Sequence, residues 1–313
     1  MARGTHLPPP FESPAWSIHA AFGLRFHSRL DWLPLRRVED TSSRFDVEVT
    51  FGAVPAGLGG EAFKTPRFEA QPGRLLFKTR TIADYLVEDG CRVRVSPRPG
   101  AGRLELCNLL FGGVTGGLLI QRGTLALHGC SIETPSGAVV FCGASGTGKS
   151  TLAGALLERG FRVLDDNIAA LDPRAGEWRV QPGLGYLRLT GDALKLLEKR
   201  PRGPCFPAPY EMKYLHFLGA EGFCVEARPL RHIFVLDRAC PVLEEPLRGE
   251  DKLAAVRRHT FVAPMAPALG MLQHHFRRWI ELAHDTPMSR LGRPPEDGME
   301  AWTRRIAGLI AGR

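Results

Sequence analysis

The sequence lacks the cysteine pattern of a disulfide framework or a zinc ribbon. It has seven cysteines, an odd number, and no two of them are spaced as CxxC. Secreted disulfide scaffolds have an even number of conserved-looking cysteines, and zinc ribbons have paired CxxC motifs. We therefore predict reduced thiols, most of them buried.

Long apolar runs are also missing. The longest, Leu109–Ile120, is interrupted by two glycine pairs and is shorter than the roughly 18 to 20 residues of a membrane helix. The first residues, Met1–Trp16, have no continuous apolar stretch and no small-residue cleavage site, which argues against a secretory signal. The sequence predicts no membrane partner and a cytoplasmic location.

A dense basic stripe is the third absence. Lys and Arg number 41 and Asp and Glu 33, which gives a net charge of +8, but the positive residues are scattered singly or in pairs such as Arg36-Arg37. A nucleic-acid interface needs clustered positive charge with interleaved aromatic residues. The pattern argues against nucleic acid as the main partner. Scattered positive charge fits a solvated surface, or a field that steers an anionic, phosphate-bearing ligand.

The length of 313 residues corresponds to about two domains at roughly 150 residues each. Short runs of alternating polar and apolar residues between Ser17 and Pro97 predict a β-rich N-terminal domain, 1–103. After a Pro- and Gly-rich turn, the apolar segment Leu104–Gln121 is predicted to be helical and to open an α/β domain, 104–313. Helical runs at Ala268–His284 and Gly298–Ile310 have apolar faces, which either pack in the core or form a homo-oligomer contact.

A phosphate-binding loop is the sharpest chemical signal. Gly143–Ser150 reads GASGTGKS, a full match to GxxxxGK[ST] between a predicted strand and a predicted helix. Backbone N–H groups of such a loop surround phosphate oxygens, the lysine supplies a positive charge, and the serine hydroxyl can ligate Mg²⁺. The predicted nucleotide-binding residues are Gly143, Ala144, Ser145, Gly146, Thr147, Gly148, Lys149, Ser150 and Thr151.

Two adjacent acids follow the next predicted strand, Phe161–Leu164. In a parallel α/β layer the carboxyl ends of strands meet at one edge, so Asp165 and Asp166 are expected beside the phosphate loop. One carboxylate can then reach Mg²⁺ and the other a substrate hydroxyl. Mutual repulsion is expected to separate their pKa values. The alternative is a solvated acidic turn.

A predicted hairpin brings one histidine to the same place. Thr134–Gly137 reads as a tight turn, so antiparallel partners have residue numbers that sum to about 271. His128 then lies opposite Gly143, beside the phosphates. The alternative is a core histidine that is satisfied by the backbone.

At these residues the chain resembles a known family. Three features resemble the catalytic domain of HPr kinase/phosphorylase: the sequence LHG, a loop of the GxSGxGKST type, and RGxxxxDD. The residues that carry them in this chain are His128, Gly143–Thr151, Arg159-Gly160 and Asp165-Asp166. The flanking segments AFGLRFHSRLDWLPL and Pro287–Pro294 are similar to a bacterial branch of peptide-modification kinases, including kinases of lasso-peptide precursors.

This resemblance implies an α/β phosphate-loop kinase domain related to phosphoenolpyruvate carboxykinase, with ATP and Mg²⁺ as cofactors. It implies that Asp165 is the base for the acceptor hydroxyl, that Asp166 and Ser150 hold Mg²⁺, and that His128 orients or tunes Asp165, while Lys149 contacts the phosphates. HPr enzymes carry an EIRGLG-type signature, but this chain has VQPGLGYLRL at Val180–Leu189. The resemblance therefore extends neither to phosphorolysis nor to HPr as the substrate.

Two basic residues downstream, Arg188 and Lys213, are candidates for a clamp on the transferring phosphoryl group, which needs cations around its equatorial oxygens. The alternative is that both are surface charges.

The leading functional hypothesis is an ATP-dependent kinase that phosphorylates a Ser or Thr hydroxyl of a peptide or protein, for which a lasso-type precursor is a candidate. A second is a small-molecule kinase like adenylylsulfate kinase, whose LDGDN is similar to Leu164–Asn167. A third is a nucleotide-dependent binding module that transfers nothing.

Overall fold

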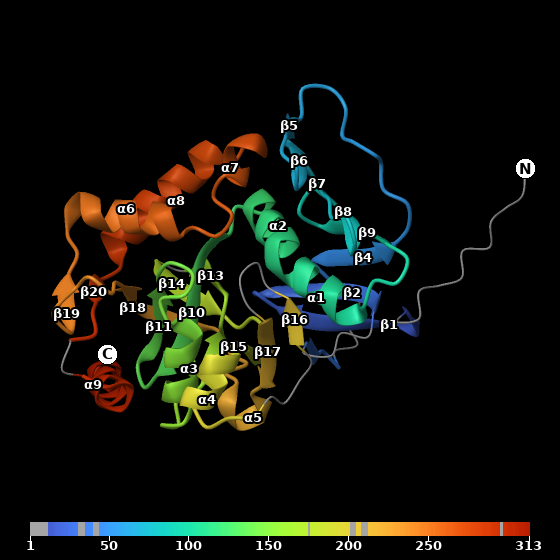
Figure 1. The fold of residues 1–313 in the computed structure, drawn as a ribbon. Coiled ribbons are helices and arrows are strands. Elements are labelled where there is room, and N and C mark those ends of the chain that lie inside the picture. Colours follow the sequence, from blue (N-terminus) through green and yellow to red (C-terminus); the bar gives the residue numbers. More distant parts are fainter. Residues whose placement is uncertain are drawn as a thin grey trace, which may run out of the picture.

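The computed structural model describes residues 12–30, 35–39, 44–174, 176–200, 205–207, 212–294 and 297–313. It shows a mixed α/β protein with two large sheets and one small sheet (Figure 1). Most of the segment on which the absence of a secretory signal was predicted lies outside these residues. The six cysteines whose side chains are described are free, and all but Cys91 are buried, as predicted.

The first sheet has nine strands in the order β3-β1-β2-β4-β9-β8-β7-β6-β5. Alternate residues are buried along β2, β4 and β9, which is the pattern of strands with one face on the core. The strands predicted from alternating residues are confirmed. The bounds of all nine strands of this sheet are β1 (Glu12–Ala21), β2 (Leu24–Leu30), β3 (Arg36–Arg37), β4 (Val47–Phe51), β5 (Phe63–Lys64), β6 (Phe68–Gln71), β7 (Arg74–Phe77), β8 (Ala83–Glu88) and β9 (Arg92–Pro97).

A helical segment with a kink at Gly112 covers the inner face of this sheet. It consists of α1 (Arg103–Leu109), a π-helical turn η1 (Leu110–Val114) and α2 (Thr115–Gln121). Its apolar residues share one core with the first sheet, and the Tyr85 hydroxyl donates to the Leu106 carbonyl oxygen at 3.0 Å. That core extends across the boundary expected at Arg103, which remains a prediction.

This segment corrects one expectation from the sequence. Over Arg103–Gln121, 19 residues with a mean hydropathy of 1.3, it is long and apolar enough to cross a membrane. The first glycine pair kinks the helix, because Gly112 has non-helical backbone angles (φ −111°, ψ −114°). The second pair lies within α2 where neighbouring side chains approach closely; a Cβ at Gly117 would lie 2.2 Å from Leu75. Since 67% of the segment is buried in the protein, a core helix accounts for it. The cytoplasmic location and the lack of a membrane partner remain predictions.

The second sheet contains the predicted hairpin. β10 (Leu125–Thr134) and β11 (Gly137–Cys142) pair from Gly129–Cys142 to Thr134–Gly137, so partner numbers sum to 271, as predicted. The sheet order is β11-β10-β13-β14-β18-β20-β19, and β11 also pairs with β18. The other strands are β12 (Val163–Asp165), β13 (Ile168–Arg174), β14 (Glu177–Gln181), β18 (Arg228–Leu236), β19 (Glu244–Pro246) and β20 (Met288–Leu291).

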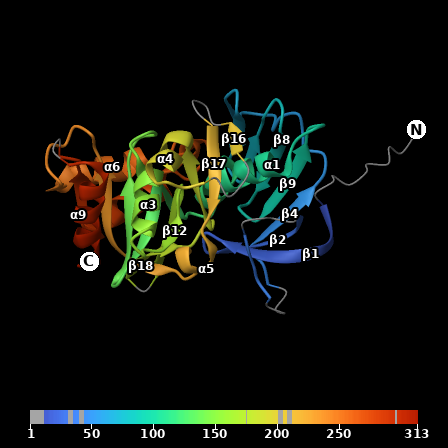
Figure 2. The same ribbon diagram turned by 60° about the horizontal axis from the view of Figure 1, so that its bottom comes forward.

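Three parallel strands of this sheet end at one edge. β11, β18 and β20 run in the same direction, so the segments after Cys142, Leu236 and Leu291 emerge together. Helices α3 (Lys149–Leu157), α4 (Gly191–Leu196) and α9 (Met299–Ala311) surround this edge. Figure 2 shows α9 and the nine-stranded sheet at opposite ends of the molecule.

The remaining elements complete the second half of the chain. A small sheet has the order β15-β17-β16. Helices α6, α7 and α8 lie along one side of the second sheet (Figure 1). The bounds are β15 (Tyr186–Thr190), β16 (Cys205–Pro207), β17 (Met212–Phe217), α5 (Gly219–Gly222), α6 (Gly249–His259), α7 (Met265–Ala268) and α8 (Leu272–Asp285).

Candidate functional site

The phosphate loop has the backbone conformation that its glycines predict. Gly143, Gly146 and Gly148 have φ angles of 153°, 80° and 103°, a region that residues with a side chain rarely adopt. The hydroxyl of Thr147 donates to the Ala144 carbonyl oxygen at 2.9 Å and closes the loop. Helix α3 begins directly after it, so its N-terminal N–H groups face the loop.

Lys149 is folded over this loop. Its side chain is buried, and Nζ donates to the carbonyl oxygens of Gly143 at 2.8 Å and Ala144 at 3.1 Å. Burial lowers the pKa of this amine. Both hydrogen-bond partners belong to the loop itself, so Lys149 lies where the phosphates of a nucleotide would bind.

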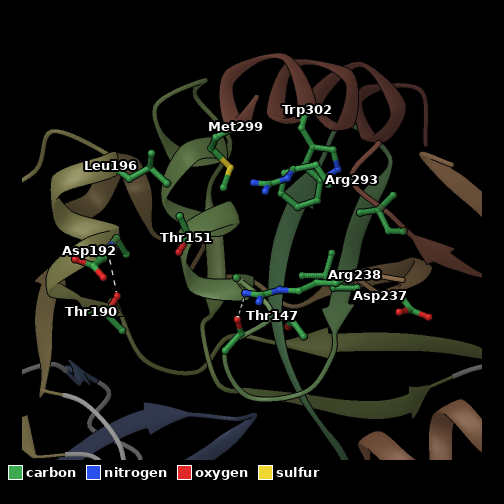
Figure 3. Close-up of a pocket in the computed structure, with 15 residues that line it drawn as sticks. Thr147, Thr151, Thr190, Asp192, Leu196, Asp237, Arg238, Arg293, Met299 and Trp302 are labelled. Carbon is green, nitrogen blue, oxygen red and sulfur yellow. Dashed lines mark hydrogen bonds between the residues drawn. The ribbon is translucent and has the colours of Figure 1, made fainter. Parts of the chain in front are cut away.

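A cavity of about 440 Å³ adjoins the loop (Figure 3). Its size falls in the range of small-molecule sites. Leu196 of α4 and Met299 and Trp302 of α9 give it apolar walls. Its charged lining residues are two arginines, Arg238 and Arg293, and two acids, Asp192 and Asp237. The Arg238 guanidinium donates to the Gly146 carbonyl oxygen at 2.5 Å, so a cation borders the loop.

Two contacts hold α9 against this cavity. The Arg159 guanidinium, at the end of the phosphate-loop helix, donates to Glu300 at 2.5 Å. The indole N–H of Trp302 donates to the Gly292 carbonyl oxygen at 2.7 Å. Trp302, Met299 and Arg238 were not among the site residues predicted from the sequence, because they lie at least 80 residues from the loop and no local pattern marks them.

The two acids reach the loop by a different route from the one expected. β12 is not a neighbour of a parallel strand: it pairs antiparallel with β10, and β10 pairs antiparallel with β11 on its other side. The parallel layer assumed at this point was therefore wrong. β11 and β12 still run in the same direction, so Asp165 and Asp166 emerge at the same edge as the phosphate loop.

Asp165 is bound by the backbone. Its Oδ1 accepts N–H groups of Asn167 and Ile168, both at 2.6 Å, and its Oδ2 accepts the N–H of Leu184 at 2.8 Å. Burial raises the pKa of this carboxyl, against the lowering effect of these three donors. The contacts fix the β12–β13 turn and the loop before β15, so Asp165 positions both.

Asp166 has free hydrogen-bonding capacity. Its Oδ2 accepts the N–H of Arg188 at 2.7 Å, whereas Oδ1 is buried and has no partner among the described residues. Burial raises the pKa of the Asp166 carboxyl to about 6, and hydrogen bonds from Arg188 and the Ser150 hydroxyl oppose that rise. A buried, unpartnered carboxylate oxygen is costly, which is typical of a group that meets a ligand.

The protein oxygens at the site fit a Mg²⁺ ion that is shared with a nucleotide. The Ser150 hydroxyl lies close enough to Asp166 to lower the pKa of its carboxyl, and Oδ1 of Asp166 has no hydrogen-bond partner among the described residues. The described residues contain no group of three or more His, Cys, Asp or Glu side chains that could hold a metal ion. Mg²⁺ commonly takes one or two protein ligands and completes its shell with phosphates and waters, so this pair is sufficient.

His128 lies beside the site with a different strand partner. The β10–β11 ladder ends one residue earlier than expected, and His128 pairs with Ile168 of β13 instead of Gly143, because the chain turns away at Gly143 into the loop. Its Nδ1 lies 3.3 Å from the Asn167 carbonyl oxygen, and its ring packs on Phe261. Burial and the charge of Lys149 lower the His128 pKa to about 4, so the ring is neutral at pH 7.

The two basic residues expected as a clamp have different environments. Arg188 donates to the Tyr186 hydroxyl at 3.2 Å, and its charge acts on both Asp165 and Asp166. The charge of Lys213 lowers the pKa of both His128 and Lys149. Both residues thus act electrostatically on site residues, and their role as a clamp remains a prediction.

A second histidine, His259 at the end of α6, was missed. It is buried, and its pKa is lowered to about 4 by burial and by the charge of Lys149. The local sequence does not predict this position, because the packing of α6 on β10 brings His259 to the site.

Neutral buried histidines predict an acid-sensitive fold. Burial lowers the pKa of His128 and His259 to about 4 and of His232 to about 3, whereas each has about 6.5 in the unfolded chain. The unfolded state therefore binds more protons, and stability falls as pH drops below about 7. We expect the free energy of unfolding to fall by about 2 kcal/mol between pH 7.5 and pH 6.

Urea unfolding at both pH values measures this loss. Asp166 acts in the opposite sense because its raised pKa favours the folded state as pH falls, but this effect is concentrated below pH 6. A free energy of unfolding that stays constant between pH 7.5 and pH 6 would contradict the prediction. In the His232→Asn variant the free energy of unfolding should fall by less over this pH range, because only two of the three histidines remain.

A glycine supports the acidic pair. A Cβ at Gly183 would lie 2.2 Å from Asp165 Oδ2 and 2.6 Å from the Phe22 ring. We expect Gly183→Ala to displace Asp165, to lower the free energy of unfolding by about 1–3 kcal/mol and to reduce activity at the site. Gly185→Ala is the matched control, since its Cβ would make an ordinary 3.4 Å contact with Phe223. Equal free energies of unfolding for Gly183→Ala and Gly185→Ala, measured with urea, would contradict this prediction.

The comparisons with known proteins give little further support. No protein-family model matches the chain, and no curated protein matches it. Among solved structures, the HPr(Ser) kinase/phosphatase from Coxiella burnetii is similar at a TM-score of 0.34 and 14% sequence identity, over 60% of this chain and 88% of that chain. This likeness is weak, so the functional conclusion rests on the site itself.

Proposed function

We propose that this protein is an ATP-dependent phosphotransferase that moves the γ-phosphoryl group to a Ser or Thr hydroxyl of a peptide or protein. The observation that carries the proposal is the buried Oδ1 of Asp166, which has no hydrogen-bond partner within the described ranges and lies beside Ser150, at the sheet edge where the phosphate loop begins. Phosphoryl transfer is one of the few functions that need both a phosphate loop of this conformation and a buried carboxylate oxygen that can meet a ligand.

The nucleotide would lie across the phosphate loop. The loop N–H groups, Lys149 and Arg238 would contact the phosphates, and the cavity bordered by Trp302 and Met299 has room for the nucleoside. Apolar walls with a few convergent charges are typical of such sites. Mg²⁺, when bound by Ser150 and Asp166, would supply charge neutralisation at the phosphate oxygens.

The acceptor hydroxyl would approach the γ-phosphorus from the side of the acids. Its oxygen forms the new bond to phosphorus, the bond to the bridging β–γ oxygen breaks, and the hydroxyl proton passes to the acidic pair. Asp165 was expected to accept this proton, but three backbone donors occupy its oxygens. We assign the contact with the reacting groups to Asp166 and the positioning of the pair to Asp165.

His128 would help to position this pair. Its contact with the Asn167 carbonyl oxygen ties it to the turn that Asp165 also binds. Because its pKa is lowered to about 4, the ring would be neutral during the reaction and would act by hydrogen bonding rather than by charge.

The test is phosphoryl transfer in the presence of Mg-ATP. The purified protein is incubated with a library of Ser- and Thr-bearing peptides, lasso-type precursors included, and with small hydroxyl compounds such as adenylylsulfate, and the products are analysed by mass spectrometry. A phosphoryl group on a peptide supports the proposal. Phosphate found only on a small molecule would favour a metabolite kinase, and nucleotide binding without transfer would favour a nucleotide-dependent binding module.

A further inference from the structure

A second cavity lies in the N-terminal half of the chain, apart from the phosphate loop. Its volume is about 630 Å³, and it shares no lining residue with the cavity beside the loop. It lies where β7 and β9 end, beside the end of α1. The lining residues are Pro66, Arg67, Phe77, Lys78, Thr79, Arg80, Arg98 and Leu109.

Four of these residues are cations, and none is an acid. Two of the cations are already paired: Lys78 Nζ donates to Glu69 at 2.5 Å and to the Ala56 carbonyl oxygen at 2.7 Å, and Arg98 donates to Asp84 at 2.7 Å. These pairs hold the walls in place.

The other two cations carry the excess positive charge of the cavity. Arg67 and Arg80 are exposed, and in the part of the chain that the structure describes neither guanidinium group has a hydrogen bond or an ion pair; the hydrogen bonds of Arg67 are those of its backbone. Two guanidinium groups that border one cavity without counter-charges favour an anionic occupant. Their planar donor geometry matches carboxylates, which they can bind through two parallel hydrogen bonds.

The floor of the cavity is apolar and fixed. The Phe77 ring packs against the backbone of Gly113 in the helical segment, where an added Cβ would lie 3.1 Å from the ring. Leu109 of α1 and Pro66 add further apolar surface. A ligand that fills this cavity therefore needs apolar groups as well as negative charge.

We propose that this cavity binds an acidic peptide segment in which apolar residues alternate with Asp or Glu. Carboxylates would meet Arg67 and Arg80, while apolar side chains would cover Phe77 and Leu109. Clusters of arginine are a recurrent device for recognising acidic motifs. The cavity is far larger than an inorganic anion requires, and the Phe77 ring is packed against Gly113 rather than free to stack with bases, so a peptide fits better than phosphate or nucleic acid.

This binding goes beyond phosphoryl transfer and does not depend on it. Neither the phosphate loop nor the acidic pair contributes to the cavity. If the chain phosphorylates a peptide, the cavity would anchor a segment of the acceptor away from the reacting hydroxyl.

Fluorescence polarisation with the full chain and no nucleotide tests the proposal. The probe is a fluorescein-labelled peptide of alternating Glu and Leu, and a peptide with Gln for Glu is the charge control. We expect the Glu peptide to bind and the Gln peptide to bind at least about tenfold more weakly, with the affinity falling as salt is added. The double variant Arg67→Glu, Arg80→Glu should weaken binding by at least about tenfold.

Arg94→Glu is the matched variant, because Arg94 is an exposed arginine of β9 that does not line the cavity. Its affinity should stay within about twofold of the unchanged protein. No binding of the Glu peptide, or equal loss in Arg94→Glu, would overturn the proposal. Displacement of the peptide by millimolar phosphate or by a single-stranded oligonucleotide at equal concentration would also overturn it, in favour of those ligands. Binding that is unchanged in Lys149→Ala separates this test from the fate of the proposed activity.

Discussion

Asp166→Asn is expected to lower phosphoryl transfer by about 10³-fold or more while nucleotide still binds. The substitution removes the negative charge that faces Ser150 but keeps an oxygen that can accept the Arg188 N–H, so the fold should be preserved. Transfer is measured as phosphopeptide formed under Mg-ATP, and nucleotide binding by calorimetry without metal. Asp172→Asn is the control, because Asp172 is a half-buried acid of β13 that pairs with Arg174 at 2.7 Å and belongs to no part of the site.

Asp165→Asn provides the internal comparison within the acidic pair. An amide at this position would direct an NH₂ group toward backbone N–H donors, so we expect the free energy of unfolding to fall by about 1–3 kcal/mol. Asp166→Asn should leave it nearly unchanged. If Asp165→Asn is fully stable and loses transfer while Asp166→Asn keeps it, Asp165 is the reacting carboxylate and our assignment is wrong.

The metal dependence of Asp166→Asn distinguishes its two chemical roles. Partial recovery of transfer at raised Mg²⁺ concentration would indicate a metal ligand, since weaker binding can be offset by concentration. Loss that persists at every Mg²⁺ concentration would indicate a proton acceptor.

Lys149→Ala is expected to lower transfer by at least about 10³-fold and to weaken ATP binding. Its ammonium group is the only buried side-chain cation of the phosphate loop itself, and it lies against the Gly143 and Ala144 carbonyl oxygens, where phosphate charge would accumulate. Burial lowers the pKa of Lys149, which means that it disfavours the charged form of the amine. The fold should therefore tolerate the loss of this charge.

Lys64→Ala, an exposed lysine of the edge strand β5, is the control for the lost charge. Both variants are compared by thermal unfolding and by ATP titration. ATP affinity and transfer rate equal to those of the unchanged protein in Lys149→Ala would mean that the loop does not bind phosphate.

The local parts of the site could be predicted because short-range rules determine them. The two-residue turn fixed the hairpin register, and the GxxxxGKS spacing predicted the loop at the end of β11. Alternation predicted two strands of the first sheet, β4 and β9. In each case the signal lies within about ten residues, where turn geometry and side-chain periodicity act directly.

The long-range parts could not be predicted, because they depend on strand order and packing. The position of β10 between β11 and β12 is a property of the whole sheet. Because of it, β12, which ends at Asp165, pairs with an antiparallel strand and not with the parallel strand that was expected. The walls formed by Trp302 and Arg238 come from segments whose local pattern is ordinary. Backbone N–H groups, including that of Leu184, bind the Asp165 oxygens. This could not be predicted, because it depends on where the loop before β15 lies in the folded chain.

The most direct test of the account is a single-turnover measurement of phosphoserine or phosphothreonine formed per ATP, with a responsive peptide from the library and with the unchanged protein, Asp166→Asn and Lys149→Ala side by side. We expect one phosphoryl group on the peptide for each ADP formed in the unchanged protein and almost none in the two variants. Equal phosphopeptide yields in all three proteins, or ADP formed by the unchanged protein without any phosphorylated acceptor, would contradict it.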